Sequence, residues 1–337
     1  MTYSAQGNTA PKPYELVSFP KERPKLARPA GHDRYQRDLL HGALHLTLEV
    51  ETALHVSTGV VAMGSDVGNS RIPLIKTMTH SGDRQLVIQG SSLKGCVRSI
   101  YEAITNSTLA VITSKYRDRI PPERYPCKNR EELCPASRVF GAMDWQGLIT
   151  FADANCRATP PSVGFMPSLY APDPKRPGYY GRNGRVLGRK FYYNTDRSID
   201  KGENRGIPVQ QAGRSLTFET IWHYRNLAPA ELGILLIVLG QDPQAPIALK
   251  VGGGKPIGMG TMTATVTALE QSADVRDRYR QYDRATDPRI VGAALKQAID
   301  RQIQVAYSSP LLQRTQLTEL VDVLRYPSDR QPPSGMY

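Results

Sequence analysis

The residues best suited to chemistry follow a glycine near position 90. Two hydroxyls and two cations come within eight positions of Gly90: Ser91, Ser92, Lys94 and Arg98. A serine oxygen can cap the first turn of a helix, and Lys94 and Arg98, four residues apart, share a helix face. Free amides, hydroxyls and cations at a helix N-terminus suit a phosphate group. The pattern therefore indicates either a phosphate site or an ordinary capped turn between a strand and a helix.

A second candidate phosphate site is the glycine-rich segment 251–261, VGGGKPIGMGT. Gly253, Gly254 and Gly258 allow backbone amides to approach a phosphate closely, and Lys255 adds positive charge. The segment lacks the lysine-plus-hydroxyl ending of a Walker A motif and the spacing of a dinucleotide fingerprint. On its residues alone it is either a tight turn or a contact to a nucleic-acid backbone.

A third group of polar residues lies in an irregular stretch between positions 176 and 205. Eight cations, Arg189 and Lys190 among them, are interleaved there with aromatic side chains. Positive charge can follow an RNA backbone while rings stack on unpaired bases, so the pattern favours contact with single-stranded RNA. The alternative is a solvated insertion whose aromatic side chains anchor it to the core.

The composition restricts the class of partner. The chain has 337 residues, 40% of them hydrophobic, a formal net charge of +12 and an isoelectric point near 9.5. This charge favours nucleic acid before membrane, although a merely basic soluble protein has the same composition. Four cysteines are too few for a disulfide scaffold, the first residues contain no apolar run, and no apolar stretch is long enough to span a bilayer. We therefore expect a cytoplasmic protein with reduced thiols.

The elements that must position these residues alternate between strands and helices. Apolar residues alternate with polar ones over 43–52, which predicts a half-buried strand, and recur every three or four residues after position 90, which predicts a helix. Further strands are expected over 147–154, 215–224 and 261–269, and a helix over 228–240. The order strand, helix, strands, helix, strand predicts an α+β fold with a ferredoxin-like (RRM-like) core.

We expect three regions along the chain. Residues 1–42 form a basic, proline-rich N-terminal arm that binds RNA, wraps a neighbouring subunit or is a floppy tail. Residues 43–268 form the main domain, with a large insertion over about 109–204. Residues 269–337 form a helical C-terminal extension whose two amphipathic helices dock as an accessory cap.

Four segments resemble signature motifs of the RAMP superfamily, the repeat-associated proteins of CRISPR systems. Residues 89–99, QGSSLKGCVRS, resemble the family's G-S-S-L-K-G signature, with Gln89 where proline is usual. Residues 133–154 are similar to its cysteine-proline and phenylalanine-glycine block, and 251–261 to its glycine-rich loop. Residues 188–193, GRKFYY, are similar to a segment of type III-D and III-E backbone subunits. The resemblance implies a ferredoxin-like core with a thumb-type insertion that kinks a guide RNA.

The same resemblance implies a backbone subunit of a type III CRISPR effector. Such a subunit binds crRNA and target RNA, holds the guide backbone with the serines and cations after Gly90 and with the glycine-rich loop, and assembles with other CRISPR effector subunits. In the family an aspartate after the first strand, with a divalent ion such as Mg²⁺, cleaves target RNA. Here Arg71 stands at the matching position and Asp66 is the nearest acid. Either Asp66 is the catalytic residue, or the subunit is structural and binds without cutting.

Related subunits also carry a structural zinc beside the cysteine-proline block. Cys127 and Cys134, completed by Cys156 or a histidine, are the candidate ligands in this chain, and buried free thiols are the alternative. A further alternative for function is a stand-alone, metal-independent endoribonuclease that processes guide RNA. In that case a histidine near the first strand acts as general base on a 2′-hydroxyl.

Overall fold

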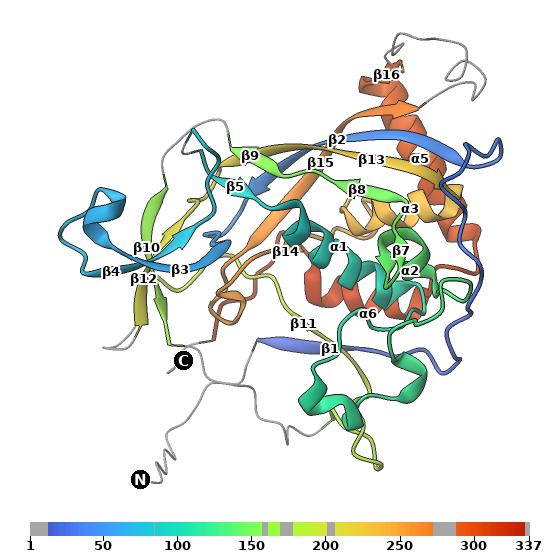
Figure 1. The fold of residues 1–337 in the computed structure, drawn as a ribbon, viewed down its shortest axis with the longest axis horizontal. Helices are drawn as coiled ribbons and strands as arrows, with labels where there is room; N and C mark the ends of the chain where they lie inside the picture. The colour runs from blue at the N-terminus through green and yellow to red at the C-terminus, as the bar shows by residue number, and fades with distance from the viewer. Residues whose placement is uncertain are drawn as a thin grey trace.

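The computed structural model describes residues 13–83, 85–156, 161–168, 178–200, 206–271 and 288–333. The strands of its main sheet are β2 (Leu40–Val50), β5 (Val87–Ile88), β8 (Ile149–Phe151), β9 (Ala154–Cys156), β13 (Thr217–Leu227), β14 (Leu249–Lys250), β15 (Thr261–Gln271) and β16 (Arg289–Ile290). They pair antiparallel in the order β14-β15-β2-β13-β9-β5, with β8 also on β13 and β16 also on β15. The sheet curls across the upper part of Figure 1.

Strict alternation explains the long strands of this sheet. In β13 every second side chain from Phe218 to Tyr224 is buried, and in β2 the same holds for Leu44, Leu46 and Leu48. Leu46 lies opposite β13 on one side and β15 on the other, so β2 is the central strand. One face of the sheet is therefore apolar, and the predicted strand over 43–52 is confirmed.

Helices cover the apolar face of the sheet: α1 (Gly90–Ile104), α2 (Pro135–Phe140), α3 (Pro229–Val238), α5 (Gly292–Ser308) and α6 (Arg314–Leu324). α3 is buried all round, and it approaches α5 closely because Gly233 has no side chain. A β-carbon at Gly233 would lie 2.0 Å from the Gln302 carbonyl oxygen. In the described part of the chain, no helix is both long enough and apolar enough to cross a membrane.

The C-terminal helices belong to the core rather than forming a separate cap. α6 packs against α1 and buries Leu317, Leu320 and Leu324, while α5 buries Ile299 and Ile303 against the rest of the core. Their apolar stripes were visible as amphipathic patterns in the sequence. The two predicted amphipathic helices are therefore docked on the main domain, and the buried face of α6 covers α1 itself.

A second, smaller sheet projects to one side, at the left of Figure 1. Its strands are β3 (Ser57–Met63), β4 (Leu74–Met78), β10 (Ser162–Pro167) and β12 (Gly206–Gln211). They pair in the order β10-β12-β4-β3, and the 3-10 turn η1 (Gly64–Val67) lies in the connection between β3 and β4. A small apolar cluster of Met166, Val209, Ile257 and Met259 joins this sheet to the glycine-rich segment.

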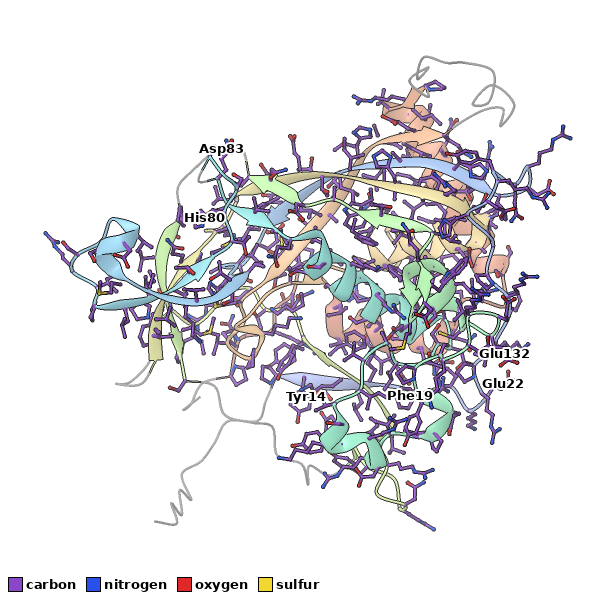
Figure 2. The ribbon with its side chains drawn as sticks, in the orientation of Figure 1. Tyr14, Phe19, Glu22, His80, Asp83 and Glu132 are labelled. Atoms are coloured by element: carbon purple, nitrogen blue, oxygen red, sulfur yellow. The ribbon has the colours of Figure 1, made fainter. Side chains whose placement is uncertain are left out.

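Part of the predicted N-terminal arm is built into the fold. β1 (Tyr14–Ser18) pairs antiparallel with β11 (Gly188–Tyr192), and Val17 is fully buried. The buried Arg124 holds the next residues by donating to the carbonyl oxygens of Pro20 and Glu22. In Figure 2 the labels of Tyr14, Phe19 and Glu22 follow this segment along the lower side of the molecule. The alternative of a floppy tail is therefore wrong for residues 14–22, whereas RNA binding and the wrapping of a neighbouring subunit stay predictions. Residues 1–12 lie outside the described part.

The region predicted as an insertion, 109–204, contributes to several parts of the molecule. It holds two short 3-10 turns, η2 (Ser114–Arg119) and η3 (Pro122–Arg124), and a two-stranded ribbon of β6 (Gly141–Ala142) and β7 (Trp145–Gln146). It also supplies α2, β8 and β9 of the main layer, β10 of the small sheet and β11.

Candidate nucleic-acid interface

The first turn of α1 has a polar edge with unused hydrogen-bonding groups. The helix begins at Gly90, and the side chain of the capping residue, Gln89, makes no capping bond. The expectation that Ser91 or Ser92 caps the helix is therefore wrong. Instead, the Asp153 carboxylate accepts a hydrogen bond from the Gly90 amide at 2.7 Å. Neither serine hydroxyl has a hydrogen-bond partner among the described residues, so both are available to a ligand.

The shape of the loop between β14 and β15 depends on four glycines with positive φ. Gly252, Gly254, Gly258 and Gly260 have φ values of 74°, 69°, 87° and 86°, and a β-carbon at each would lie 2.4 Å or less from another atom. Gly253 is different, because the nearest atoms to its β-carbon would be 3.7 Å away. The fold therefore requires glycine at positions 252, 254, 258 and 260. At Gly253, by contrast, neither the backbone conformation nor a neighbouring atom excludes a side chain.

The glycine-rich loop lies beside α1. The Cys96 thiol on α1 donates to the Lys250 carbonyl oxygen at 3.4 Å, and burial raises the pKa of this thiol although the charge of Lys255 opposes the rise. On the other side of the loop, the Gly253 amide donates to the His55 carbonyl oxygen at 2.8 Å. The middle of α1 and the start of the glycine-rich loop are therefore neighbours.

Lys250 is a buried cation beneath this loop. Its Nζ donates to the Gly258 carbonyl oxygen at 3.1 Å and to the Thr261 hydroxyl at 2.9 Å. The Thr52 hydroxyl donates to the same Gly258 oxygen at 2.8 Å. Burial, with a smaller contribution from the nearby Lys255, lowers the pKa of Lys250 to about 7. Near physiological pH, Lys250 is therefore present in both its neutral and its charged form while it holds the loop.

Lys250 should make stability depend on pH. The unfolded lysine has a pKa near 10.5, so between about pH 7 and pH 10 the unfolded chain binds more protons than the native one. The free energy of unfolding should therefore rise with pH in this window, by roughly 1.4 kcal/mol per unit from this residue alone. Lys250→Met should lose this component of the slope, measured by urea unfolding across the window. Lys296→Met, on the exposed side of α5, is the control; equal slopes in both variants would contradict the assignment.

Two of the arginines predicted to contact RNA are engaged within the protein. Arg98 donates to the Glu102 carboxylate at 2.7 Å, to the Gly141 carbonyl oxygen at 2.7 Å and to the Ser137 hydroxyl at 3.1 Å. Arg189 pairs with the other oxygen of Glu102. Their side chains are only 14% and 18% exposed. The structure therefore places both arginines as links between α1, α2 and β11, with their hydrogen-bonding groups engaged inside the protein.

The remaining predicted cations are closer to the surface. Lys94 is half-buried near the two serines, and burial, followed by repulsion from Arg98, lowers its pKa. Lys190 is exposed on β11, where its Nζ lies 4.9 Å from the ring centre of Tyr14 and 5.0 Å from that of Tyr192. Of these cations, the structure brings only Lys94 to the first turn of α1.

The family comparison covers this whole region. Residues 47–263, more than half of the chain, match the family model of the RAMP superfamily, and the match includes α1 and the glycine-rich loop. The chain belongs to the RAMP superfamily. RAMP proteins are CRISPR-associated proteins that bind RNA and other CRISPR subunits, and the curled antiparallel sheet with its helices is consistent with a RAMP fold. A search of curated proteins found no match to the sequence.

Asp66, the predicted catalytic residue of this RAMP protein, lies in η1 between β3 and β4. Its side chain is exposed, and its nearest hydrogen-bonding neighbour is the Ser65 hydroxyl at 3.4 Å. Within the described ranges, no three His, Cys, Asp or Glu side chains are grouped to hold a metal. Magnesium is often bound by one or two carboxylates together with substrate phosphates. Asp66 therefore suits the role of one ligand of a magnesium ion that RNA phosphates also bind. It does not form a metal site alone.

The predicted zinc ligands of this RAMP protein are only partly brought together. The Cys134 amide donates to the Cys127 sulfur at 3.3 Å, and the Thr108 hydroxyl lies within 3.5 Å of both sulfurs. Burial opposes ionisation of Cys134, yet hydrogen bonds from its neighbours lower its pKa and raise that of Cys127. Cys156 lies on β9, paired with β13. A structural zinc needs four ligands, and among the described residues no third His, Cys, Asp or Glu side chain joins this pair of thiols.

Several residues of this site were not predicted from the sequence. Lys250 follows an apolar run and precedes the glycines, which is the only local sign of its role. Asn194 is fully buried and donates to the carbonyl oxygens of Ala248 and Leu324, while its own oxygen accepts from Thr261. It therefore joins the strand below the loop to α6. Nothing in the sequence around Asn194 indicates these long-range contacts.

Proposed function

We propose that this RAMP protein is a crRNA-binding backbone subunit of a type III CRISPR effector. The observation that carries the proposal is the meeting of α1 with the glycine-rich loop. Ser91, Ser92 and Lys94 lie on the first turn of α1, and Gly253 and Lys255 lie on the loop beside it. Hydroxyls, open backbone and lysines suit phosphates and sugars, and contacts of this kind carry no sequence information. The guide would be read by pairing with target RNA.

The proposal includes a ferredoxin-like core. Along the chain β2, α1, β8 with β9, β13, α3 and β15 follow the order strand, helix, strand, strand, helix, strand. Across the sheet these strands lie in the order fourth, first, third, second. This arrangement supports the ferredoxin-like assignment because it is the split βαβ pattern with both helices on one face.

We assign the thumb to the small sheet of β3, β4, β10 and β12. The sheet projects from the main domain in Figure 1 and is joined to it near the glycine-rich loop. Val60, Met63 and Leu74 are 56%, 58% and 52% exposed on the β3–β4 hairpin. Apolar side chains at the end of a projecting sheet suit packing against RNA bases or a neighbouring subunit. This assignment moves the thumb away from a single 109–204 insertion.

If the subunit cuts target RNA, Asp66→Asn should slow cleavage by at least about 100-fold, because metal-assisted charge stabilisation is worth several kcal/mol. Guide binding should be unchanged, since Asp66 is exposed on η1 and not on α1 or the glycine-rich loop. Cleavage would be measured with the assembled effector, target RNA and Mg²⁺. Asp83→Asn removes an exposed acid from a different turn and is the control. Unchanged cleavage at every site would remove Asp66 from consideration and favour the structural subunit.

The alternative of a stand-alone guide-processing nuclease has less support from the histidines near β2. His41 contacts the Gln36 carbonyl oxygen, and His45 contacts the Glu270 carboxylate. His55 is only 2% exposed, and burial lowers its pKa. A general base must reach the hydroxyl whose proton it removes, and in this structure none of the three histidines is placed on an open surface beside α1.

The proposed function is tested by purifying the protein from its host under native conditions and sequencing the RNA bound to it. Repeat-derived guides in a multi-subunit particle are the expected result. Random RNA on a monomer, or no RNA, would overturn the guide-holding role. Processing of naked repeat RNA by the isolated chain without metal would instead support the nuclease alternative.

A further inference from the structure

A basic lobe is formed by two segments that the proposed guide site does not use. The lobe consists of residues 114–125, which contain η2 and η3, and the hairpin 179–187. The Val186 amide donates to the Arg119 carbonyl oxygen at 2.8 Å and joins the two segments. In Figure 1 they lie at the lower end of the ribbon, in teal and yellow-green.

The side chains of the basic lobe combine cations with tyrosine rings. Three of its charged groups lie between 4.8 and 5.7 Å from a ring centre. The pairs are Lys115 on Tyr116, Arg119 on Tyr116 and Tyr180, and Arg117 on Tyr125. Tyr116 as a residue is 45% exposed, so it has surface left for a further planar group. Pro121 and Pro122 restrict the backbone that carries these rings.

Most of the positive charge of the basic lobe has no acidic partner in the described part of the chain. Elsewhere on the surface cations pair with acids, as Arg28 does with Glu131 and Arg289 with Glu270. Apart from the buried Arg124, the lobe has five cations, and none of them has a carboxylate within 4.0 Å among the described residues: Lys115, Arg117, Arg119, Arg182 and Arg185. Only two acids lie in its segments, Asp118 and Glu123. An uncompensated basic surface attracts a polyanion.

We propose that the basic lobe binds single-stranded RNA, with an unpaired base stacked on Tyr116 and phosphates held by the surrounding cations. Rings with exposed faces require bases that are not already stacked in a duplex, and cations beside them follow the backbone. An acidic protein or an anionic membrane would match the charge, but neither uses the aromatic faces in this way. The inference rests on the proposed function only in taking RNA as the polyanion.

The test uses the full chain and an oligouridine of about 16 nucleotides, the upper end of site sizes for single-strand modules. Tyr116→Ala should weaken binding roughly tenfold, because one stacked base contributes about that factor. Tyr116→Phe should bind like the wild type, since it keeps the ring. The double variant Lys115→Ala and Arg117→Ala should weaken binding and reduce its salt dependence. Lys296→Ala with Arg301→Ala on α5 removes two exposed cations elsewhere and should have little effect.

Ultraviolet crosslinking of the oligouridine separates this inference from the proposed function. Crosslinks at Tyr116 or Tyr180, lost in Tyr116→Ala while thermal unfolding is unchanged, are the expected result. Crosslinks confined to the first turn of α1 and the glycine-rich loop, with Tyr116→Ala binding normally, would overturn the lobe and leave the guide site standing. Crosslinks confined to the lobe would instead support the lobe and contradict the guide site. A Tyr116→Ala variant that loses binding to anionic vesicles but keeps its binding to oligouridine would also overturn the RNA assignment.

Discussion

Gly258→Ala is expected to lower the free energy of unfolding by about 3 kcal/mol or more. Gly258 has a φ of 87°, a conformation that alanine adopts at a cost, and its β-carbon would lie 2.3 Å from the Arg197 carbonyl oxygen. Its own carbonyl oxygen accepts from Lys250 and Thr52. Movement of the loop would therefore leave a buried lysine with fewer partners.

Gly253→Ala is the matched control for this prediction. The atoms nearest to the new methyl group would belong to His55 and Met166, at 3.7 Å or more, which is ordinary contact. Its free energy of unfolding should stay within about 0.5 kcal/mol of the wild type, as for most surface changes. Urea unfolding of both variants gives the comparison. If Gly258→Ala and Gly253→Ala were equally stable, the loop would not be held as the structure describes. In addition, weaker RNA binding by a stable Gly253→Ala variant would support the proposed contact at this open backbone.

The local patterns of the sequence were sufficient for the central elements of the fold. β2 and β13 alternate, and α1 repeats its apolar residues every three or four positions, because each buries only one face. The small sheet could not be predicted in the same way. Its strands β4 and β12 are parallel neighbours that are far apart in the sequence, and exposed side chains on β3 break the alternation. Such pairings depend on tertiary packing, which no short window contains.

The candidate site shows the same division between local and long-range information. The hydroxyls of Ser91 and Ser92 could be placed on a helix edge from the sequence, and the structure leaves both without partners among the described residues. Arg98 was assigned to the same edge from its spacing to Lys94. Its charge is instead neutralised by Glu102, which is four residues further along the helix and was visible as an i,i+4 pair. The other partners of Arg98 come from the α2 region, and only the fold reveals them.

The carboxylate that caps α1 changes the electrostatics of the proposed guide site. The Asp153 carboxylate occupies the Gly90 amide, so an incoming phosphate would not have the whole helix N-terminus to itself. Negative charge at this position also reduces the local attraction for RNA. Binding at α1 should therefore depend on the side chains of the first turn and on the loop lysine more than on the helix dipole. Lys94 and the two serines are therefore the decisive group at this end of the helix.

Replacing Ser91, Ser92 and Lys94 together by alanine is expected to weaken guide RNA binding by about 100-fold, the loss of roughly two good polar contacts. The slope of log affinity against log salt concentration should become less steep by about one unit, because one lysine–phosphate contact is removed. Folding should be preserved, since the serine hydroxyls bond to no described residue and alanine favours a helix. Filter binding at several salt concentrations, with thermal unfolding alongside, measures both effects.

Gly95 allows a sharper version of the same test. It lies exposed in α1 one residue after Lys94, and a β-carbon there would meet no atom within 4 Å. Glycine inside a helix costs about 1 kcal/mol relative to alanine, so Gly95→Ala should raise stability by a similar amount. If RNA approaches this turn closely, the added methyl group should weaken guide binding at the same time. A variant that is more stable and binds guide RNA normally would place the RNA backbone elsewhere, whereas opposite changes in stability and affinity would assign it to the first turns of α1.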